Sequence, residues 1–362
     1  MRVLLGTNHL ERLSGSETVL YEFAEYLEGL GCDLTVFANW TAKPMVRRFL
    51  KRGLAVVTDP LTVRPFEYDL CYFQHQIAGL FDYQTHHNDR VSTTIAIGRL
   101  SPNGLMESGG WAHDEVLADV VLANSAETER ALRVAGTTTA IEVFHNAAPT
   151  SFHRTRRRLV HERPERILVV TNHRDPHTMA AVERLRSIVE VEHIGRSGDR
   201  TTPITPKMIA NVDVVVSIGK TVQYALASRT PVFVYDRFGG PGYLNANNFS
   251  NAEYYNFSGR CTPVRMTSDD IVNRVLSDYP KARMFYAALD ESVIGRYRLP
   301  TYIDKLVNRE PRSNADRRAS FIVRMPEVER ERLVSTYVRS SYIRRQRDTK
   351  MRTEAKALNV VL

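Results

Sequence analysis

The stretch RVLLGTNHLERLSGSETVLYEFAEYLEGLGCDLTVFA, residues 2–38, indicates the fold of the first half of the chain. A short apolar run at each end has the composition of a buried strand. Between these runs, Ser14 and Glu17 have the spacing of a capping box, an apolar face recurs with helical period, and Gly31 is placed to end the helix. Strand, glycine-containing loop, helix and strand together form a βαβ unit, which implies a parallel sheet.

The same alternation continues along the chain. Further strands are predicted at 68–73, 93–98, 119–124, 140–146, 166–172, 189–195, 212–219 and 231–236. Further helices are predicted at 125–136, 178–187 and within 268–308.

These elements predict an α/β fold with two doubly wound, Rossmann-like domains facing a cleft. The first covers 1–150, a charged linker covers 151–165, the second covers 166–310, and a basic helical tail covers 311–362. In such sheets ligands bind at the carboxyl ends of the strands.

The bulk composition is that of a soluble protein. Apolar residues make up 43% and charged residues 25% of 362 residues, a length suited to two domains. Three distant cysteines without a CxxC pair suggest neither a disulfide framework nor a zinc site. We find no signal peptide and no stretch of about 18 apolar residues, so a cytoplasmic protein is expected, in the host cytoplasm if the chain is viral.

The positive charge belongs to the tail. Residues 311–362 contain 13 Lys and Arg against 6 Asp and Glu, whereas the rest of the chain is nearly balanced. Alternating apolar residues at 321–325, a helix from Pro326 and a basic helix from about 341 faintly resemble a ribbon-helix-helix DNA-binding unit. The alternative is a solvated amphipathic extension that mediates homo-oligomer contacts or touches an anionic surface.

The stretch SIGKTVQYALASRTP, 217–231, predicts an anion site. It is not a Walker A loop, because the glycine five positions before Gly219 is missing. Gly219 allows a sharp turn, Thr221 can cap the following helix, and Lys220 places a positive charge beside the helix N-terminus. The alternative is an ordinary turn with a surface lysine.

The stretch YDRFGGPGYL, 235–244, predicts a stiff loop almost free of side chains. Gly239, Gly240 and Gly242 would let its backbone approach a sugar or a phosphate closely. An ordinary turn is again the alternative.

These motifs resemble those of family 4-type glycosyltransferases of the GT-B fold. Residues 2–38 are similar to the family's N-terminal unit, and 118–148 to its entry into the interdomain linker. Residues 212–244 with NFSGR, 256–260, resemble a bacterial and viral subgroup linked to surface-polysaccharide or virion glycosylation. The resemblance implies transfer of a sugar from a nucleotide-diphosphate sugar, a UDP-sugar or GDP-sugar, to a protein or glycan acceptor, with retention favoured and no separate cofactor.

The resemblance also implies where the donor binds. The sites it suggests are Gly15 and Ser16 at the first helix start, His173 and the phosphate-binding Arg174 after strand 166–172, Gly195 and Arg196 after strand 189–195, and Ile204 beside the nucleoside base. Arg196 is equally well explained as a solvated loop residue.

One position departs from the family pattern. Where related enzymes place a glutamate before an Ala-x-Ala helix, this chain has Tyr224, and no glutamate lies in the preceding ten residues. Gln223, Tyr224 and the glycine stretch are the candidates to replace the missing carboxylate contacts.

The catalytic groups expected are Lys220, Arg174 and His75. No Asp-x-Asp motif occurs, so the leaving diphosphate would be stabilised without a metal, by the helix start and by cations. His75, after strand 68–73, is the candidate general base or acceptor-orienting group, unless it only lines the cleft. His9 and His173 are secondary candidates for this role, and no metal site is expected, including at His86 and His87.

The sequence is also compatible with two other functions. The first is a DNA-modifying glycosyltransferase whose basic tail binds nucleic acid, with binding that weakens steeply with salt. The second is an inactive nucleotide-sugar-binding protein on the same scaffold, because the glutamates are missing.

Overall fold

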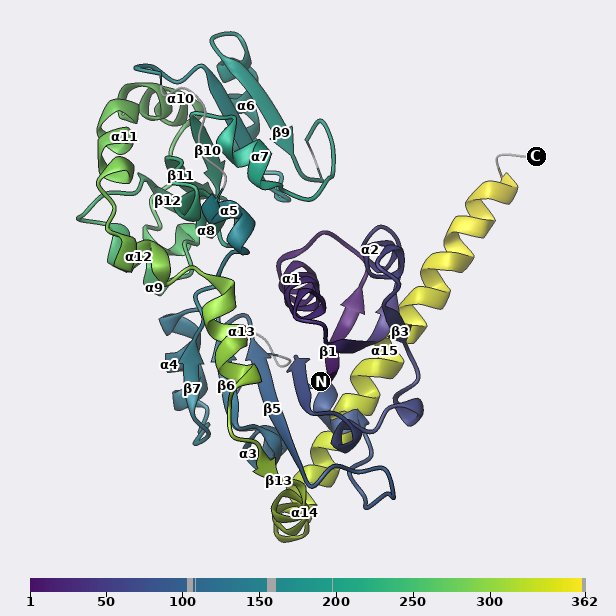
Figure 1. Ribbon diagram of the computed structural model, residues 1–362. Helices are drawn as coiled ribbons and strands as arrows, with labels where there is room; N and C mark the ends of the chain where they lie inside the picture. The colour runs from purple at the N-terminus through teal and green to yellow at the C-terminus, as the bar shows by residue number, and fades with distance from the viewer. Residues whose placement is uncertain (103–106, 108, 155–160, 197, 360–362) are drawn as a thin grey trace. The chain divides into compact units, whose positions relative to one another are not determined.

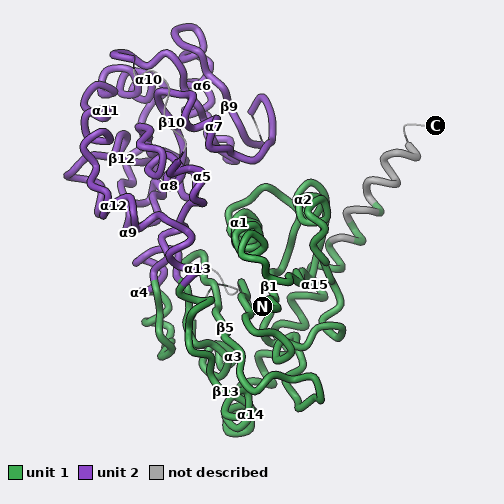
Figure 2. Tube along the Cα trace, in the orientation of Figure 1, with its two compact units in different colours: residues 1–122, 131–142, 305–362 green, residues 123–130, 143–304 purple. Residues whose placement is uncertain are grey.

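The computed structural model describes the chain except residues 103–106, 108, 155–160, 197 and 360–362; at 346, 349, 350 and 352–359 it describes only the backbone. The chain divides into two compact units, shown in Figure 2. Unit 1 comprises residues 1–122, 131–142 and 305–362, and unit 2 comprises residues 123–130 and 143–304.

Unit 1 is built on a mainly parallel sheet with the strand order β3-β2-β1-β4-β5-β6-β7. Its strands are β1 (Arg2–Leu10), β2 (Asp33–Thr41), β3 (Ala55–Val57), β4 (Leu70–Gln74), β5 (Ser92–Arg99), β6 (Val120–Ala123), β7 (Ile141–Val143) and β13 (Arg312–Ser313). The strands β2 and β4 both pair in parallel with the central β1, and β13 pairs antiparallel with β5.

The helices that accompany this sheet come from both ends of the chain (Figure 1). They are α1 (Gly15–Gly29), α2 (Met45–Lys51), α3 (Ala112–Leu117), α14 (Asn314–Val323) and α15 (Met325–Asn359), with the 3-10 turns η1 (Pro60–Thr62), η2 (Pro65–Glu67) and η3 (Ile77–Leu80). Helix α4 (Ala126–Val134) is divided between the two units. The apolar face of α1 is buried as its period predicts, and Phe23 stacks on Tyr72 of β4 at 4.3 Å between ring centroids.

Unit 2 has a five-stranded sheet with the order β12-β11-β10-β8-β9. Its strands are β8 (Arg166–Val170), β9 (Glu190–Ile194), β10 (Val214–Ser217), β11 (Val232–Asp236) and β12 (Gly239–Tyr243). All neighbours pair in parallel except β12, which is antiparallel to β11.

Alternate residues of these strands enter two separate cores. Leu168 and Val215 belong to one core, whereas Ile167 and Val216 belong to the other. Both faces of the sheet are therefore covered by helices, as a doubly wound fold requires. The helices are α5 (Thr150–Arg154), α6 (Pro176–Arg186), α7 (Pro206–Ala210), α8 (Lys220–Ala227), α9 (Phe249–Tyr254), α10 (Ser268–Ser277), α11 (Tyr279–Ala287) and α12 (Glu291–Gly295), with the 3-10 turn η5 (Gly259–Cys261). Helix α13 (Leu299–Val307) begins in unit 2 and ends in unit 1. The prediction of two doubly wound, Rossmann-like α/β units is thus confirmed.

The unit boundaries differ from those expected from the sequence. The chain crosses between the units near 122, 130, 142 and 304 rather than at a single linker. Part of the predicted linker 151–165 lies outside the described residues. At its start, Phe152 of α5 is buried in a core of unit 2, so this segment belongs to that unit.

The prediction of a strand at 321–325 is wrong, because α14 covers 314–323. The Ser313 side chain caps this helix by accepting from the Asp316 amide. Helix α15 then runs without interruption to Asn359, leaving no turn between two helices, which rules out the ribbon-helix-helix arrangement.

The tail is also not a separate extension, because it is anchored to unit 1 by buried polar contacts. Arg317 is fully buried and donates to the carbonyl of Leu117 at 2.8 Å and to the carboxylate of Asp119 at 2.6 Å. Glu331 of α15 accepts from the backbone amide and the imidazole of His113 at 3.0 and 2.9 Å. Removing either partner of such a buried pair leaves an uncompensated charge, so α14 and α15 are integral to unit 1.

The glycine stretch 239–243 is a strand and not the loop that its composition predicted. A Cβ atom on Gly240 would lie 2.2 Å from the carbonyl oxygen of Val234 on the paired strand, and one on Gly239 would lie 2.6 Å from that of Thr262. Gly242, with φ +78°, packs against the Arg274 guanidinium. The three glycines are therefore explained by close backbone packing.

Candidate functional site

The carboxyl ends of β8, β9 and β10 are tied together in unit 2. Ser217 at the end of β10 donates its hydroxyl to the carbonyl of Val170 at the end of β8, at 2.8 Å. The side chain of Asn172 accepts from the Arg196 amide at 3.1 Å and so links the loop after β8 to the loop after β9. Gly195 makes this approach feasible, because a Cβ atom there would lie 1.8 Å from the carbonyl oxygen of Thr171.

Helix α8 begins at this edge with an uncapped N-terminus. Gly219 is its N-cap, with φ 56° and ψ −136°, and no side chain caps the helix. Glycine is favoured at a backbone position with positive φ, which explains why residue 219 is a glycine. The start of the helix thus presents the positive end of its dipole without a side-chain cap, an arrangement that suits an anion.

Lys220 is held beside this helix start. Its Nζ atom donates to the carbonyl oxygens of Asn146 at 3.0 Å and Ala147 at 2.6 Å, and it lies 5.4 Å from the centroid of the Tyr224 ring. The ammonium group therefore helps to hold residues 146–147 in place. Its positive charge lies at the N-terminal turn of α8. Thr221, also expected at the site, is buried in the same turn.

A buried amide cluster lies against the same turn. Asn256 accepts through its Oδ1 atom from Gln223 at 2.9 Å and from Asn146 at 3.1 Å. Gln223 is 1% exposed, and its Oε1 atom has no hydrogen-bond partner among the described residues. Asn146 and Asn256 both adopt left-handed backbone conformations, with φ 49° and 52°. A buried acceptor without a partner is costly, so it is a feature of the site that a donor group of a ligand would satisfy.

The surroundings of Tyr224 do not indicate a ligand-binding role. Its ring is 4% exposed and stacks on Phe152 with 4.0 Å between centroids and 2° between planes. The aromatic at this position is accounted for by the core, so Gln223 is the better candidate to replace the missing carboxylate.

The contacts of the other residues that were expected to bind the sugar donor indicate no specific role. Arg174 and Arg196 are exposed, and the His173 amide donates to the Thr171 hydroxyl at 3.1 Å. The side chain of Ile204 packs against a core of unit 2. The roles of these residues, and of Gly239, Gly240 and Gly242, stay predictions.

In unit 1, a buried glutamate organises the loop between β1 and α1. Glu17 accepts from the amides of Glu11 and Arg12, the latter at 2.7 Å, and from the Ser14 hydroxyl at 2.5 Å, in place of a capping box. Burial raises the pKa of Glu17. Ser16 is fixed through its carbonyl, which accepts from Gln74 at 3.1 Å. Gly15 has open space where a Cβ atom would stand, so the start of α1 is unobstructed within unit 1.

His75 is paired with a carboxylate that the sequence analysis missed. The imidazole is 5% exposed, and its Nδ1 atom lies 2.6 Å from Oε1 of Glu107. Burial alone would raise the pKa of Glu107, but the facing imidazole and Arg99 outweigh it and lower that pKa. The carboxylate fixes the tautomer with the proton on Nδ1, which leaves Nε2 as a base. This Nε2 atom has no hydrogen-bond partner among the described residues.

His9 lies between His75 and the C-terminal helix. Its ring stacks on His75 and on Tyr342 of α15, each with 5.9 Å between centroids. Burial, the neighbouring His75 and Arg12 lower the pKa of His9 to about 4, so this ring is neutral at physiological pH.

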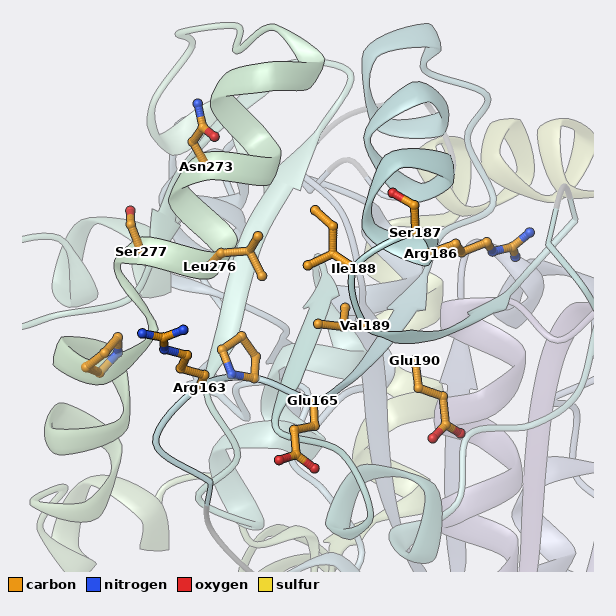
Figure 3. Close-up of a pocket in the computed structure, with 12 residues that line it drawn as sticks. Arg163, Glu165, Arg186, Ser187, Ile188, Val189, Glu190, Asn273, Leu276 and Ser277 are labelled. Atoms are coloured by element: carbon orange, nitrogen blue, oxygen red, sulfur yellow. The ribbon is translucent and has the colours of Figure 1, made fainter.

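One described pocket of unit 2 lies away from these residues. It has a volume of ≈ 1200 Å³ and lies at the amino ends of β8 and β9, since Glu165 and Val189 directly precede these strands (Figure 3). Ile188 and Leu276 line it together with charged side chains such as Arg163. It is on the edge opposite to the carboxyl ends and holds none of the expected site residues.

The described part of the chain contains no candidate membrane span and no candidate metal cluster. No helix there is long and apolar enough to span a bilayer. No group of three or more His, Cys, Asp and Glu side chains is arranged to hold a metal ion; His86 instead approaches Glu67 at 3.2 Å.

Comparison with known proteins gave structural similarity only. No family model and no curated protein matches the sequence. Among solved structures, the lipopolysaccharide outer core galactosyltransferase WaaB is 14% identical, with a TM-score of 0.49, and the match covers 85% of this chain and 98% of that one. A putative UDP-N-acetylglucosamine 2-epimerase from Listeria monocytogenes is 11% identical, with a TM-score of 0.48 and coverage of 84% and 94%. An alpha-glucosyltransferase in complex with UDP and a 13-mer DNA is 9% identical, with a TM-score of 0.47 and coverage of 85% and 100%.

Several residues at these sites carried no signal in the sequence. Glu107 and Tyr342 are brought to His75 and His9 only by the fold. Asn256 opens the NFSGR stretch, but its pairing with Gln223 and Asn146 depends on contacts between distant segments.

Proposed function

We propose that this chain is a metal-independent glycosyltransferase that moves a sugar from a nucleotide-diphosphate sugar to a hydroxyl group of a protein or glycan acceptor. The observation that carries the proposal is the uncapped N-terminus of α8 with Lys220 held beside it. Unit 2 would bind the donor and unit 1 the acceptor.

The donor diphosphate would bind at the start of α8. The helix dipole and the Lys220 ammonium stabilise negative charge there, and this charge grows on the diphosphate as it leaves. Arg174 and Arg196, at the same edge of the sheet, are the further cations available. The unpartnered Oε1 of Gln223 would accept from a donor hydroxyl, the task that a carboxylate performs in the enzymes that this chain resembles.

The acceptor hydroxyl would be deprotonated by His75. In the transfer, the bond between the anomeric carbon and the diphosphate oxygen breaks, and its electron pair leaves on the diphosphate. The bond between the anomeric carbon and the acceptor oxygen forms, and the hydroxyl proton passes to Nε2 of His75 and then to solvent. Glu107 stabilises the imidazolium that results.

The stereochemical outcome is open to direct measurement. The family resemblance favours retention, whereas a single displacement assisted by His75 gives inversion. The anomeric coupling constant of the product, read by proton NMR immediately after transfer, separates the two.

The function is tested by a thermal-shift and hydrolysis screen over UDP- and GDP-sugars, with and without EDTA. We expect at least one nucleotide sugar to raise the melting temperature and to be hydrolysed slowly, with EDTA having no effect. Loss of turnover in EDTA would contradict metal independence. Binding without any turnover would indicate a nucleotide-sugar-binding protein and not an enzyme.

A further inference from the structure

Helix α15 crosses the edge of the unit 1 sheet where the strands end. Ser335 donates its hydroxyl to the carbonyl of Gln76, which follows β4, at 2.7 Å. One turn further on, Arg339 donates to the carbonyl of Thr58, which follows β3, at 2.7 Å. Tyr342 then stacks on His9 near the end of β1. The helix thus contacts the carboxyl ends of three strands, and Figure 1 shows it running past β3 and β1.

Arg339 also completes a buried network of amide side chains. It donates to Oδ1 of Asn39 at 3.0 Å, Asn39 donates to Asn8 at 2.9 Å, and Asn8 donates to Gln76 at 3.3 Å. The three amide residues are at most 5% exposed. A satisfied network of this kind fixes the helix in one register on the sheet edge.

Other buried polar atoms at this edge have no partner among the described residues. They include Nε2 of His75, Oε1 of Gln74 and Oγ1 of Thr7, on side chains that are 5%, 0% and 0% exposed. Nδ1 of His9 and Nε1 of Trp40, its neighbour on β2, are also without partners there. Unsatisfied buried groups are rare in folded proteins, and their concentration here indicates a site that a ligand completes.

The chemistry of these groups points to a neutral, hydroxyl-rich ligand. They are imidazole, amide, hydroxyl and indole groups, which exchange hydrogen bonds with hydroxyls. The charged groups near them include the carboxylates of Glu17 and Glu107, and the guanidinium of Arg339 is engaged by Asn39 and by the carbonyl of Thr58. On α15, Arg330 and Arg332 are exposed before Tyr342, and Arg344 and Arg345 are exposed after it.

We propose that α15 forms one wall of the acceptor site in unit 1, that the acceptor is a saccharide, and that Tyr342 is a positioning residue that holds His9 against His75. This inference rests on the proposed function, since it names the acceptor of the same reaction. Tyr342 acts through His9: its ring limits the movement of the His9 imidazole, which in turn packs on the His75 base.

The test compares Tyr342→Ala, Tyr342→Phe and Tyr337→Ala in the full chain. Tyr337 lies on the same helix and is 72% exposed, so it is a matched control. Binding of a panel of methyl glycosides and disaccharides is measured by saturation-transfer NMR, and transfer to the best of them by steady-state kinetics. Donor binding is followed separately by thermal shift with the nucleotide sugar.

We expect Tyr342→Ala to raise the acceptor KM at least tenfold and to leave the donor-induced thermal shift unchanged. Tyr342→Phe keeps the ring and should restore the acceptor KM to within about twofold, and Tyr337→Ala should behave as wild type. Equal acceptor KM in Tyr342→Ala and wild type would overturn the positioning role. Absence of binding by every saccharide, or binding of a duplex oligonucleotide that is lost in Arg344→Ala/Arg345→Ala, would overturn the saccharide assignment.

Failure of the proposed function gives a different result. If no nucleotide binds to the wild-type protein, the proposal about the sugar donor fails. The NMR comparison of saccharide binding by Tyr342→Ala and Tyr342→Phe still decides whether α15 forms one wall of a saccharide site.

Discussion

The imidazole of His75 and the carboxylate of Glu107 form a buried pair, with 2.6 Å between Nδ1 and Oε1. His75 also adopts a left-handed backbone conformation, with φ 62°, which is uncommon for a residue other than glycine. Such strain is retained where the surrounding structure enforces it, and it occurs often at functional sites. The pair is therefore the strongest indication of chemistry in unit 1.

Replacing Glu107 tests whether this pair acts in catalysis. Glu107→Gln removes the charge that fixes the tautomer and stabilises the imidazolium, so we expect the transfer rate to fall about 100-fold or more. Nucleotide affinity should not change, because the proposed diphosphate site at the start of α8 lies in unit 2. The rate is measured at saturating donor, and Glu25→Gln, at an exposed position of α1, serves as the control. A transfer rate in Glu107→Gln equal to that of the control would show that the pair is only structural.

His9 makes stability depend on pH in a defined window. Its pKa in the folded protein is about 4, against 6.5 for the unperturbed side chain, so the unfolded chain takes up a proton first as the pH falls. Stability from this group is complete above pH 6.5 and is lost towards pH 4, by up to about 3 kcal/mol. Urea unfolding between pH 7 and pH 4 should show a shallower loss for His9→Gln than for wild type. His177→Gln, at an exposed position, is the control. Identical slopes for His9→Gln and wild type would refute the assignment.

Tyr224 is expected to be a core residue and not a sugar ligand. Tyr224→Phe keeps the stack on Phe152 and should change the free energy of unfolding by less than about 1.5 kcal/mol, with donor binding intact. Tyr224→Glu, which restores the residue of the resembling enzymes, should destabilise unit 2 by about 3 kcal/mol or more, because it buries a charge without a partner. Denaturant unfolding with a nucleotide-binding assay measures both effects. A stable Tyr224→Glu protein with tighter donor binding would place this position at the ligand.

The alternating pattern of strands and helices could be predicted because it depends on local periodicity. The apolar runs, the Ser14–Glu17 spacing and Gly31 located β1, α1 and β2 to within a few residues. The glycine stretch 239–243 was misjudged because glycine is used there for backbone packing, which only the neighbouring Val234 and Thr262 reveal. The residues 321–325 alternate like a strand, but the Ser313 cap and the buried Arg317 favour a helix.

The candidate sites were only partly predictable. Gly219, Lys220 and His75 follow strands directly, so the general rule about carboxyl ends found them. Glu107, Asn256 and Tyr342 are joined to these residues by long-range packing, and nothing in their local sequence marks them. The C-terminal segment was judged by its charge, whereas its buried face anchors it to unit 1.

The central claim, that the N-terminus of α8 binds the donor diphosphate, is tested most directly by isothermal titration of UDP and GDP in the presence of EDTA. Lys220→Ala should bind the preferred nucleotide at least tenfold more weakly than wild type, whereas Lys281→Ala, at an exposed position of α11, should bind normally. Binding of the nucleoside without phosphates should be the same in all three proteins, which separates loss of the anion site from a general disturbance of residues 146–147. Unchanged diphosphate affinity in a folded Lys220→Ala protein would contradict the account.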